Sequence, residues 1–117
     1  NQRWFFNCVS HVETFLNPRE TLTVIKEVER RMGSVHKVRW GPRVIDVDIL
    51  LFGEETVDEH DLEVPHPLMC QRAFVLIPLA EMAPNLEHPV CGLTIQELVN
   101  RVDDKDSVRL VCGQIRI

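Results

Sequence analysis

Two aspartates, Asp46 and Asp48, are the residues whose type and spacing point most directly to chemistry. They alternate with apolar residues in the run 44–52, which predicts a β-strand with both aspartates on one face. Two residues apart on a strand, their Cα atoms would lie about 6.6 Å apart, so the carboxylates can converge on one divalent cation or on a pair. The alternative is a solvated strand face, which the two-aspartate pattern alone favours.

A basic stretch precedes this predicted strand. Residues 33–43 show no periodicity and carry Arg39, Trp40 and Arg43, which predicts a loop. An arginine can donate two parallel hydrogen bonds to phosphate oxygens, and a tryptophan offers a ring face to a planar ligand. An acidic strand behind a basic loop suits metal-assisted phosphoryl transfer. A salt bridge between Arg43 and an aspartate is the alternative, and it is the better explanation of Arg43 taken alone.

The order of these residues resembles a known family. The run W-G-P-R-x-x-D-x-D from Trp40 to Asp48, a P-H-P at 65–67 and the run 72–79 together resemble the 6-hydroxymethyl-7,8-dihydropterin pyrophosphokinase family of folate biosynthesis. The resemblance implies a ferredoxin-like α+β sandwich, with helices packed on an antiparallel sheet. It also implies an enzyme that transfers the diphosphate of ATP to the hydroxymethyl group of the pterin and releases AMP.

The resemblance assigns a role to individual residues. Asp46 and Asp48 match the ligands of two Mg²⁺ ions, and they form the expected catalytic set together with Arg43. The residues expected to bind ATP are Arg39, Arg43, His66, Arg72 and Glu29. The residues expected to bind the pterin are Phe5, Asn7, Trp40 and Phe74. Without the resemblance, these residues would be interpreted as surface charges, an exposed loop histidine and core aromatics.

Two departures from the family pattern keep other functions open. Ser34 stands where the family has an arginine, for which His36 or Lys37 is the nearest substitute. The family's opening strand, helix and strand have no counterpart in this sequence, so the sheet is expected to be incomplete at its N-terminal end. The alternative function is a non-catalytic nucleotide- or pterin-binding module, or an inactive remnant of the enzyme. A third option is a different metal-dependent phosphohydrolase.

Periodicity and capping residues predict the elements around this site. Residues 4–13 favour a strand that places Phe5 and Asn7 on one face. A helix is expected from Pro18 to about Met32, because Asn17 can cap it, Glu20 can complete a capping box and Gly33 can end it.

The second half of the chain predicts shorter elements. Residues 54–64 suggest a hairpin or an irregular excursion, and residues 79–83 suggest one or two helical turns. Thr94 and Glu97 form a capping-box pattern for a helix from Ile95 to about Arg101. Residues 108–117 suggest a terminal strand or hairpin.

Composition bounds the class of protein. The 117 residues, 44% hydrophobic and 26% charged, predict a single domain over 1–117 with one core. A net charge of -5 argues against nucleic acid as a partner, and a membrane-spanning protein is not expected. The expected partners are the two small substrates, with the chain a monomer or an oligomer that completes the sheet.

The four cysteines lack the paired spacing of a zinc site. They are Cys8, Cys70, Cys91 and Cys112. The chain shows no leader pattern, so a cytoplasmic location is expected, with thiols that are reduced and mostly buried. Two disulfides in an exported protein, or metal ligation, are the weaker alternatives.

Overall fold

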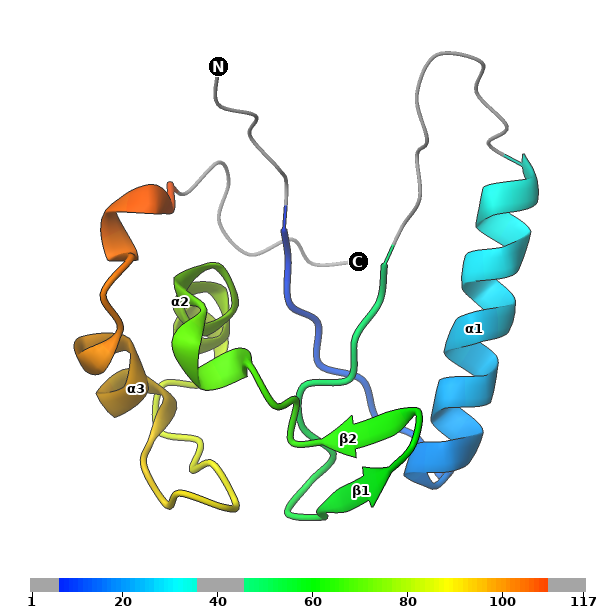
Figure 1. Ribbon diagram of the computed structural model, residues 1–117, viewed down its shortest axis with the longest axis horizontal. Coiled ribbons are helices and arrows are strands. Elements are labelled where there is room, and N and C mark those ends of the chain that lie inside the picture. The colour runs from blue at the N-terminus through cyan, green and yellow to red at the C-terminus, as the bar shows by residue number, and fades with distance from the viewer. Residues whose placement is uncertain (1–6, 36–45, 110–117) are drawn as a thin grey trace. The chain divides into compact units, whose positions relative to one another are not determined.

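The computed structural model describes residues 7–35 and 46–109 (Figure 1). Tertiary contacts divide the chain into two compact units. The first unit is Glu13–His66, and the second combines Asn1–Val12 with Pro67–Ile117. The expectation of one domain over 1–117 stays a prediction.

Helix α1, Pro18–Val35, begins where the sequence predicts. The Asn17 side chain accepts a hydrogen bond from the Glu20 N–H at 2.8 Å, and the Glu20 carboxylate accepts one from the Asn17 N–H at 2.9 Å. The predicted capping box is therefore confirmed. The helix does not end at Gly33, because a glycine ends a helix only where it turns to positive φ, and Gly33 does not.

A short antiparallel hairpin forms the sheet of the first unit. Strand β1, Val57–Glu59, pairs with β2, Leu62–Val64, and Val57 lies opposite Val64. Leu62 and Val64 are buried. Arg19, in the first turn of α1, donates hydrogen bonds to Asp61 at 2.9 Å and to Glu59. The predicted hairpin is confirmed, and these bonds hold it against the start of α1.

The two longest predicted strands are wrong wherever the structure describes them. Residues 7–13 and 46–52 form no strand, and residues 4–6, 44 and 45 lie outside the described part of the chain. A β-strand forms only where a neighbouring strand accepts and donates its backbone hydrogen bonds. The alternation of apolar and polar residues shows which side chains avoid water, but not whether such a neighbour is present. Segment 46–52 instead makes isolated hydrogen bonds, such as the 2.9 Å bond from the His66 N–H to the Leu50 carbonyl.

Two packed helices provide the core of the second unit. Helix α2, Ala73–Met82, packs on α3, Ile95–Arg101, and they are flanked by the 3₁₀ turns η1, Met69–Gln71, and η2, Lys105–Ser107. Met69, Leu76 and Ile95 are fully buried there. The turns predicted at 79–83 are only the end of α2, which accommodates Pro78 in its interior.

Helix α3 begins as predicted. The Thr94 hydroxyl accepts a hydrogen bond from the Glu97 N–H at 3.1 Å, and the Glu97 carboxylate accepts one from the Thr94 N–H at 2.9 Å. The capping box is therefore present in full. At the C-terminal end, residues 108 and 109 form no strand, and residues 110–117 lie outside the described part.

The elements make the fold α+β, with helices and an antiparallel sheet, as predicted. None of the helices within 7–35 and 46–109 combines the length and apolarity needed to cross a membrane.

The expectation of mostly buried cysteines is wrong for those that the structure describes. Cys8 and Cys91 are exposed and Cys70 is half-buried, and all three are free thiols. Cys8 lies on a segment without secondary structure and Cys91 on a loop, so neither has a packed face to cover it. Cys112 lies outside the described residues.

Candidate active site

Asp46 and Asp48 are both exposed, and a third carboxylate is bonded to the residue between them. Glu29 of α1 accepts a hydrogen bond from the Val47 backbone N–H at 2.7 Å. The Glu29 side chain is 16% exposed, whereas Val47 lies at the surface. Glu29 therefore fixes the backbone that carries both aspartates.

A second bond fixes the same segment at its other end. The His66 N–H donates to the Leu50 carbonyl at 2.9 Å, which joins segment 46–52 to the P-H-P loop. Within the first unit, these two bonds connect the segments that carry four predicted site residues. They are Glu29, Asp46, Asp48 and His66.

Salt bridges occupy the charges on the neighbouring surface of α1. Lys26 lies 3.4 Å from Glu29. Arg30 and Arg31 lie 2.5 Å and 3.2 Å from Glu27, and their hydrogen bonds lower the pKa of Glu27 to about 2. Arg30 and Arg31 are therefore paired within the helix, which leaves the arginines predicted from the motif as the expected phosphate ligands.

The second unit brings two other predicted residues together. The Arg72 guanidinium lies over the Phe74 ring, with its central carbon 5.6 Å from the ring centroid. A cation over an aromatic face is attracted by the ring's negative charge density. Phe74 remains 37% exposed at the start of α2, so part of its side chain stays accessible to a ligand.

Of the remaining predicted site residues, Asn7 is the one that the structure describes. Asn7 is exposed and lies on no strand, so its predicted strand face is absent. Four predicted site residues lie outside the described part of the chain: Phe5, Arg39, Trp40 and Arg43. Their roles stay predictions, as do those of His36 and Lys37.

The donor set of the first unit suits a hard cation. Exposed carboxylates are the oxygen ligands that Mg²⁺ accepts, and Mg²⁺ is usually held by one or two of them plus substrate phosphates. Within the described residues, Asp46 and Asp48 belong to no closed group of three donors. Two protein carboxylates with open positions for phosphate oxygens fit that mode of binding.

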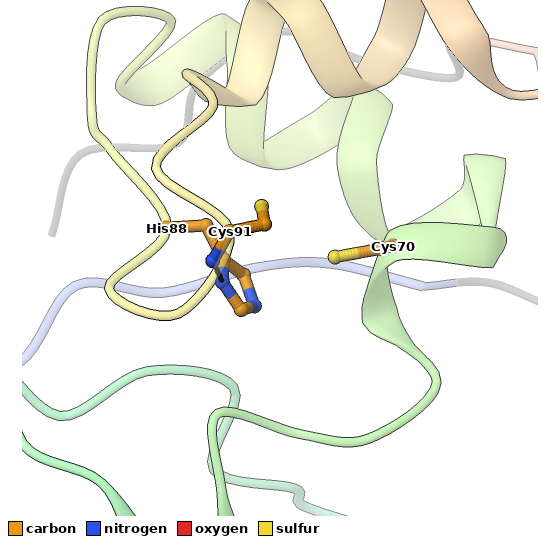
Figure 2. A group of neighbouring side chains, drawn as sticks. All are labelled: Cys70, His88 and Cys91. Atoms are coloured by element: carbon orange, nitrogen blue, oxygen red, sulfur yellow. Dashed lines mark hydrogen bonds between the residues drawn. The ribbon is translucent and has the colours of Figure 1, made fainter.

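The sequence does not predict a second group of possible metal ligands, which the structure brings together. In the part of the chain that the structure describes, the single set of three or more His, Cys, Asp or Glu side chains close enough to share one ion is Cys70, His88 and Cys91 (Figure 2). The local spacing His88-x-x-Cys91 is the signal that could have indicated it. Cys70 stands far from both in the sequence, so no motif includes all three.

Comparison with known proteins agrees with the motif. A family model described as 7,8-dihydro-6-hydroxymethylpterin-pyrophosphokinase matches residues 1–84. The chain is 39% identical over 110 residues to the 2-amino-4-hydroxy-6-hydroxymethyldihydropteridine pyrophosphokinase of Bacillus subtilis, covering 94% of this chain and 61% of that protein. It is 47% identical over 89 residues to the enzyme of that name from Pseudomonas aeruginosa, covering 76% and 55%.

A longer protein also contains a similar region. The folic acid synthesis protein FOL1 of Dictyostelium discoideum is 46% identical over 94 residues, which cover 80% of this chain and 14% of that protein. The chain therefore spans little more than half the length of the two bacterial relatives and a small part of this one.

Proposed function

Because the chain belongs to the 7,8-dihydro-6-hydroxymethylpterin-pyrophosphokinase family, we propose that it transfers the diphosphate of ATP to the hydroxymethyl group of 6-hydroxymethyl-7,8-dihydropterin. The observation that carries the proposal is the pair of exposed carboxylates on a segment fixed by Glu29 and His66. The pterin hydroxyl oxygen forms a bond to the β-phosphorus of ATP, and the bond from that phosphorus to the α,β-bridging oxygen breaks. AMP leaves with the bridging oxygen, and the hydroxyl proton passes to water.

Asp46 and Asp48 are proposed to hold two Mg²⁺ ions with the phosphates of ATP. Their exposure leaves room for both phosphate oxygens and water, which Mg²⁺ retains in such sites. When bound, Mg²⁺ supplies charge neutralisation at the phosphate oxygens. The aspartates contribute position, and Glu29 supports them through the bond to Val47.

The cationic residues are proposed to bind the phosphates directly. Arg39, Arg43, Arg72 and His66 would neutralise the charge that develops as the diphosphate moves, a contribution that depends on position and electrostatics. Phe5 and Phe74 would stack on the pterin, Asn7 would bind its polar edge, and Trp40 would cover the site. Support comes from Phe74, whose ring lies under the Arg72 guanidinium and whose side chain is partly exposed.

The broader expectations belong to the same proposal. They are a ferredoxin-like arrangement of the α+β elements, a single domain, a cytoplasmic location, and a monomer or an oligomer that completes the sheet. The two-stranded sheet with its neighbouring helix is compatible with that arrangement.

The test is AMP formation by the purified chain from ATP, Mg²⁺ and 6-hydroxymethyl-7,8-dihydropterin. We expect AMP and the pterin diphosphate in equal amounts. Asp46→Ala and Asp48→Ala should each abolish the product while the circular dichroism spectrum stays unchanged. Asp58→Ala, which removes an exposed carboxylate of β1, is the matched control and should retain activity.

Other results would overturn the proposal in distinct ways. Tight calorimetric binding of a non-hydrolysable ATP analogue and of the pterin, without AMP formation, would indicate a binding module. Inorganic phosphate released from ATP without the pterin would indicate a phosphohydrolase. Full activity in both aspartate variants would remove the magnesium role of these residues.

A further inference from the structure

Three side chains with soft donor atoms meet in the second unit. The ligand atoms of Cys70, His88 and Cys91 all lie within 4.8 Å of one another. Figure 2 shows the Cys70 sulfur pointing toward the loop that carries the other two. His88 and Cys91 lie beyond residue 84, where the family match ends, so the group is not part of the motif that defines the family.

The backbone holds each of the three donors in place. Cys70 lies in η1 directly after Met69, which is fully buried and anchors that turn. The loop with His88 and Cys91 is closed by the bond from the His88 N–H to the Leu93 carbonyl at 2.9 Å and by the bond from the Gly92 N–H to the His88 carbonyl at 2.8 Å. The donors are therefore presented by structure that does not depend on a ligand.

Gly92 lies in this loop and has a positive φ. Its value of 74° lies in the left-handed region, which a glycine adopts without the cost of a Cβ. The turn it makes returns the chain so that Glu87 lies opposite Thr94. His88 and Cys91 thus belong to one tight loop, three residues apart, which brings their side chains to a common region.

His88 has a simpler role that accounts for only part of the arrangement. Its Nδ1 accepts hydrogen bonds from the Val90 and Cys91 N–H groups at 3.2 Å and 3.3 Å, and the residue is 7% exposed. A histidine that stabilises its own loop explains those bonds. It does not explain why two thiols, one of them from a distant turn, lie beside the ring.

The protonation of the group agrees with ligand chemistry. Burial lowers the pKa of His88, so the ring is neutral near pH 7, which is the form that binds metals. Burial, and the nearby Cys91, raise the pKa of the Cys70 thiol, so this thiol is protonated without a metal. A bound cation displaces such thiol protons, and the thiolates then neutralise its charge.

We propose that Cys70, His88 and Cys91 bind one Zn²⁺ ion through two sulfurs and one ring nitrogen, with a fourth position open to water or another ligand. Sulfur and imidazole donors select zinc over magnesium. In a tetrahedral zinc site the donors lie about 3.5–3.8 Å apart, given bond lengths of about 2.3 Å to sulfur and about 2.0 Å to nitrogen. The donors must therefore close by up to about 1.3 Å from the present separation. His88 must also give up the two N–H bonds at its Nδ1 when a ring nitrogen binds the metal.

The test is Co²⁺ titration of the full chain after treatment with a chelator and a thiol-free reductant. We expect one Co²⁺ per chain, with the intense visible bands of a tetrahedral site and a thiolate-to-cobalt charge-transfer band, both removed by Zn²⁺. Cys70→Ser and Cys91→Ser should each weaken binding by more than about 100-fold, beyond the about 10–100-fold typical of a residue that only supports a ligand. Cys8→Ser removes an exposed thiol outside the group and should leave the spectrum unchanged.

His88→Gln completes the set but can disturb the loop, so Cys91→Ser, at an exposed position, is the decisive variant. Its circular dichroism spectrum should match that of the wild-type chain. Absence of the charge-transfer band in the reduced wild-type chain would overturn the proposal. A chain in which Cys70 and Cys91 form a disulfide, and which binds no Co²⁺ after reduction, would identify a redox pair instead.

Discussion

The Glu29 carboxylate accepts a hydrogen bond of 2.7 Å from the backbone N–H of Val47, the residue between Asp46 and Asp48. Residues 46–52 form no strand, so no ladder of hydrogen bonds holds the aspartates. A carboxylate supplied by α1 performs that task at one point, and the His66 N–H at another. The position of the two proposed magnesium ligands therefore depends on the side chain of Glu29, which precedes Val47 by 18 residues in the sequence.

Glu29→Ala should weaken the use of Mg²⁺ by the enzyme. A hydrogen bond to a charged group contributes about 1.5–3 kcal/mol, so its loss should raise the Mg²⁺ concentration at half-maximal AMP formation by roughly tenfold or more. Glu29→Gln keeps a neutral acceptor for the Val47 N–H, whose bond contributes about 0.5–1.5 kcal/mol, and should recover part of this loss. The measurement is the rate of AMP formation against Mg²⁺ concentration at saturating ATP and pterin.

Lys26→Ala is the matched control for Glu29. Lys26 is 66% exposed and lies 3.4 Å from Glu29, and an exposed ion pair of this kind contributes little. The Mg²⁺ dependence of this variant should match that of the wild-type chain. Equal losses in Glu29→Gln and Glu29→Ala would instead show that the charge of Glu29, rather than its bond to Val47, matters.

Phe74→Ala should impair pterin binding with little effect on stability. The ring is 37% exposed, and its contact with Arg72 contributes about 0.5–1 kcal/mol at an exposed site. Loss of a stacking partner worth about 0.5–1.5 kcal/mol should raise the KM for the pterin by roughly 2- to 10-fold. The KM for ATP should rise less, because Arg72 loses only its contact with the ring. Phe15→Ala, another exposed phenylalanine, should change neither value.

The features that the sequence predicts correctly are local. Both helix starts depend on pairs three residues apart, Asn17 with Glu20 and Thr94 with Glu97, and all four bonds form. The hairpin needs only a turn between two short apolar segments. Such features need no information about distant parts of the chain.

The features that the sequence does not predict depend on partners far along the chain. The bond from the Ala73 N–H to Asp104, which caps α2 at 3.3 Å, spans 31 residues. The run 44–52 has the alternation of a strand but, over 46–52, no neighbouring strand to pair with. The motif predicts the family and singles out Asp46 and Asp48, but residue types cannot tell that Glu29 binds the backbone between them.

Thr94→Ala should lower the free energy of unfolding of the chain. The Thr94 hydroxyl accepts the Glu97 N–H at 3.1 Å, and replacing such a cap by alanine costs about 1 kcal/mol. Urea denaturation followed by circular dichroism is the measurement. Thr23→Ala is the matched control, because Thr23 lies exposed within α1, where alanine is a better helix former. Equal destabilisation by both substitutions would refute the capping role.

The Glu97 carboxylate should make the stability of α3 depend on pH. Hydrogen bonds from Thr94 lower the pKa of Glu97 below its ordinary value of 4.5. The backbone N–H has the largest effect and the hydroxyl the next, and the charge of Arg101 adds to them. The unfolded chain therefore binds the proton first as the solution is acidified. The stabilisation is complete above the ordinary pKa and is lost as the pH falls through the lowered pKa of the folded state.

Glu97→Gln isolates this effect, because glutamine keeps an acceptor for the Thr94 N–H but does not ionise. The free energies of unfolding of wild type and variant should differ most near neutral pH, with wild type the more stable. The difference should shrink as the pH is lowered from about 6 to about 3, since the ionised carboxylate is then lost from the wild-type chain. A difference that stays constant over this interval would show that the bond from Thr94 does not depend on the charge of Glu97.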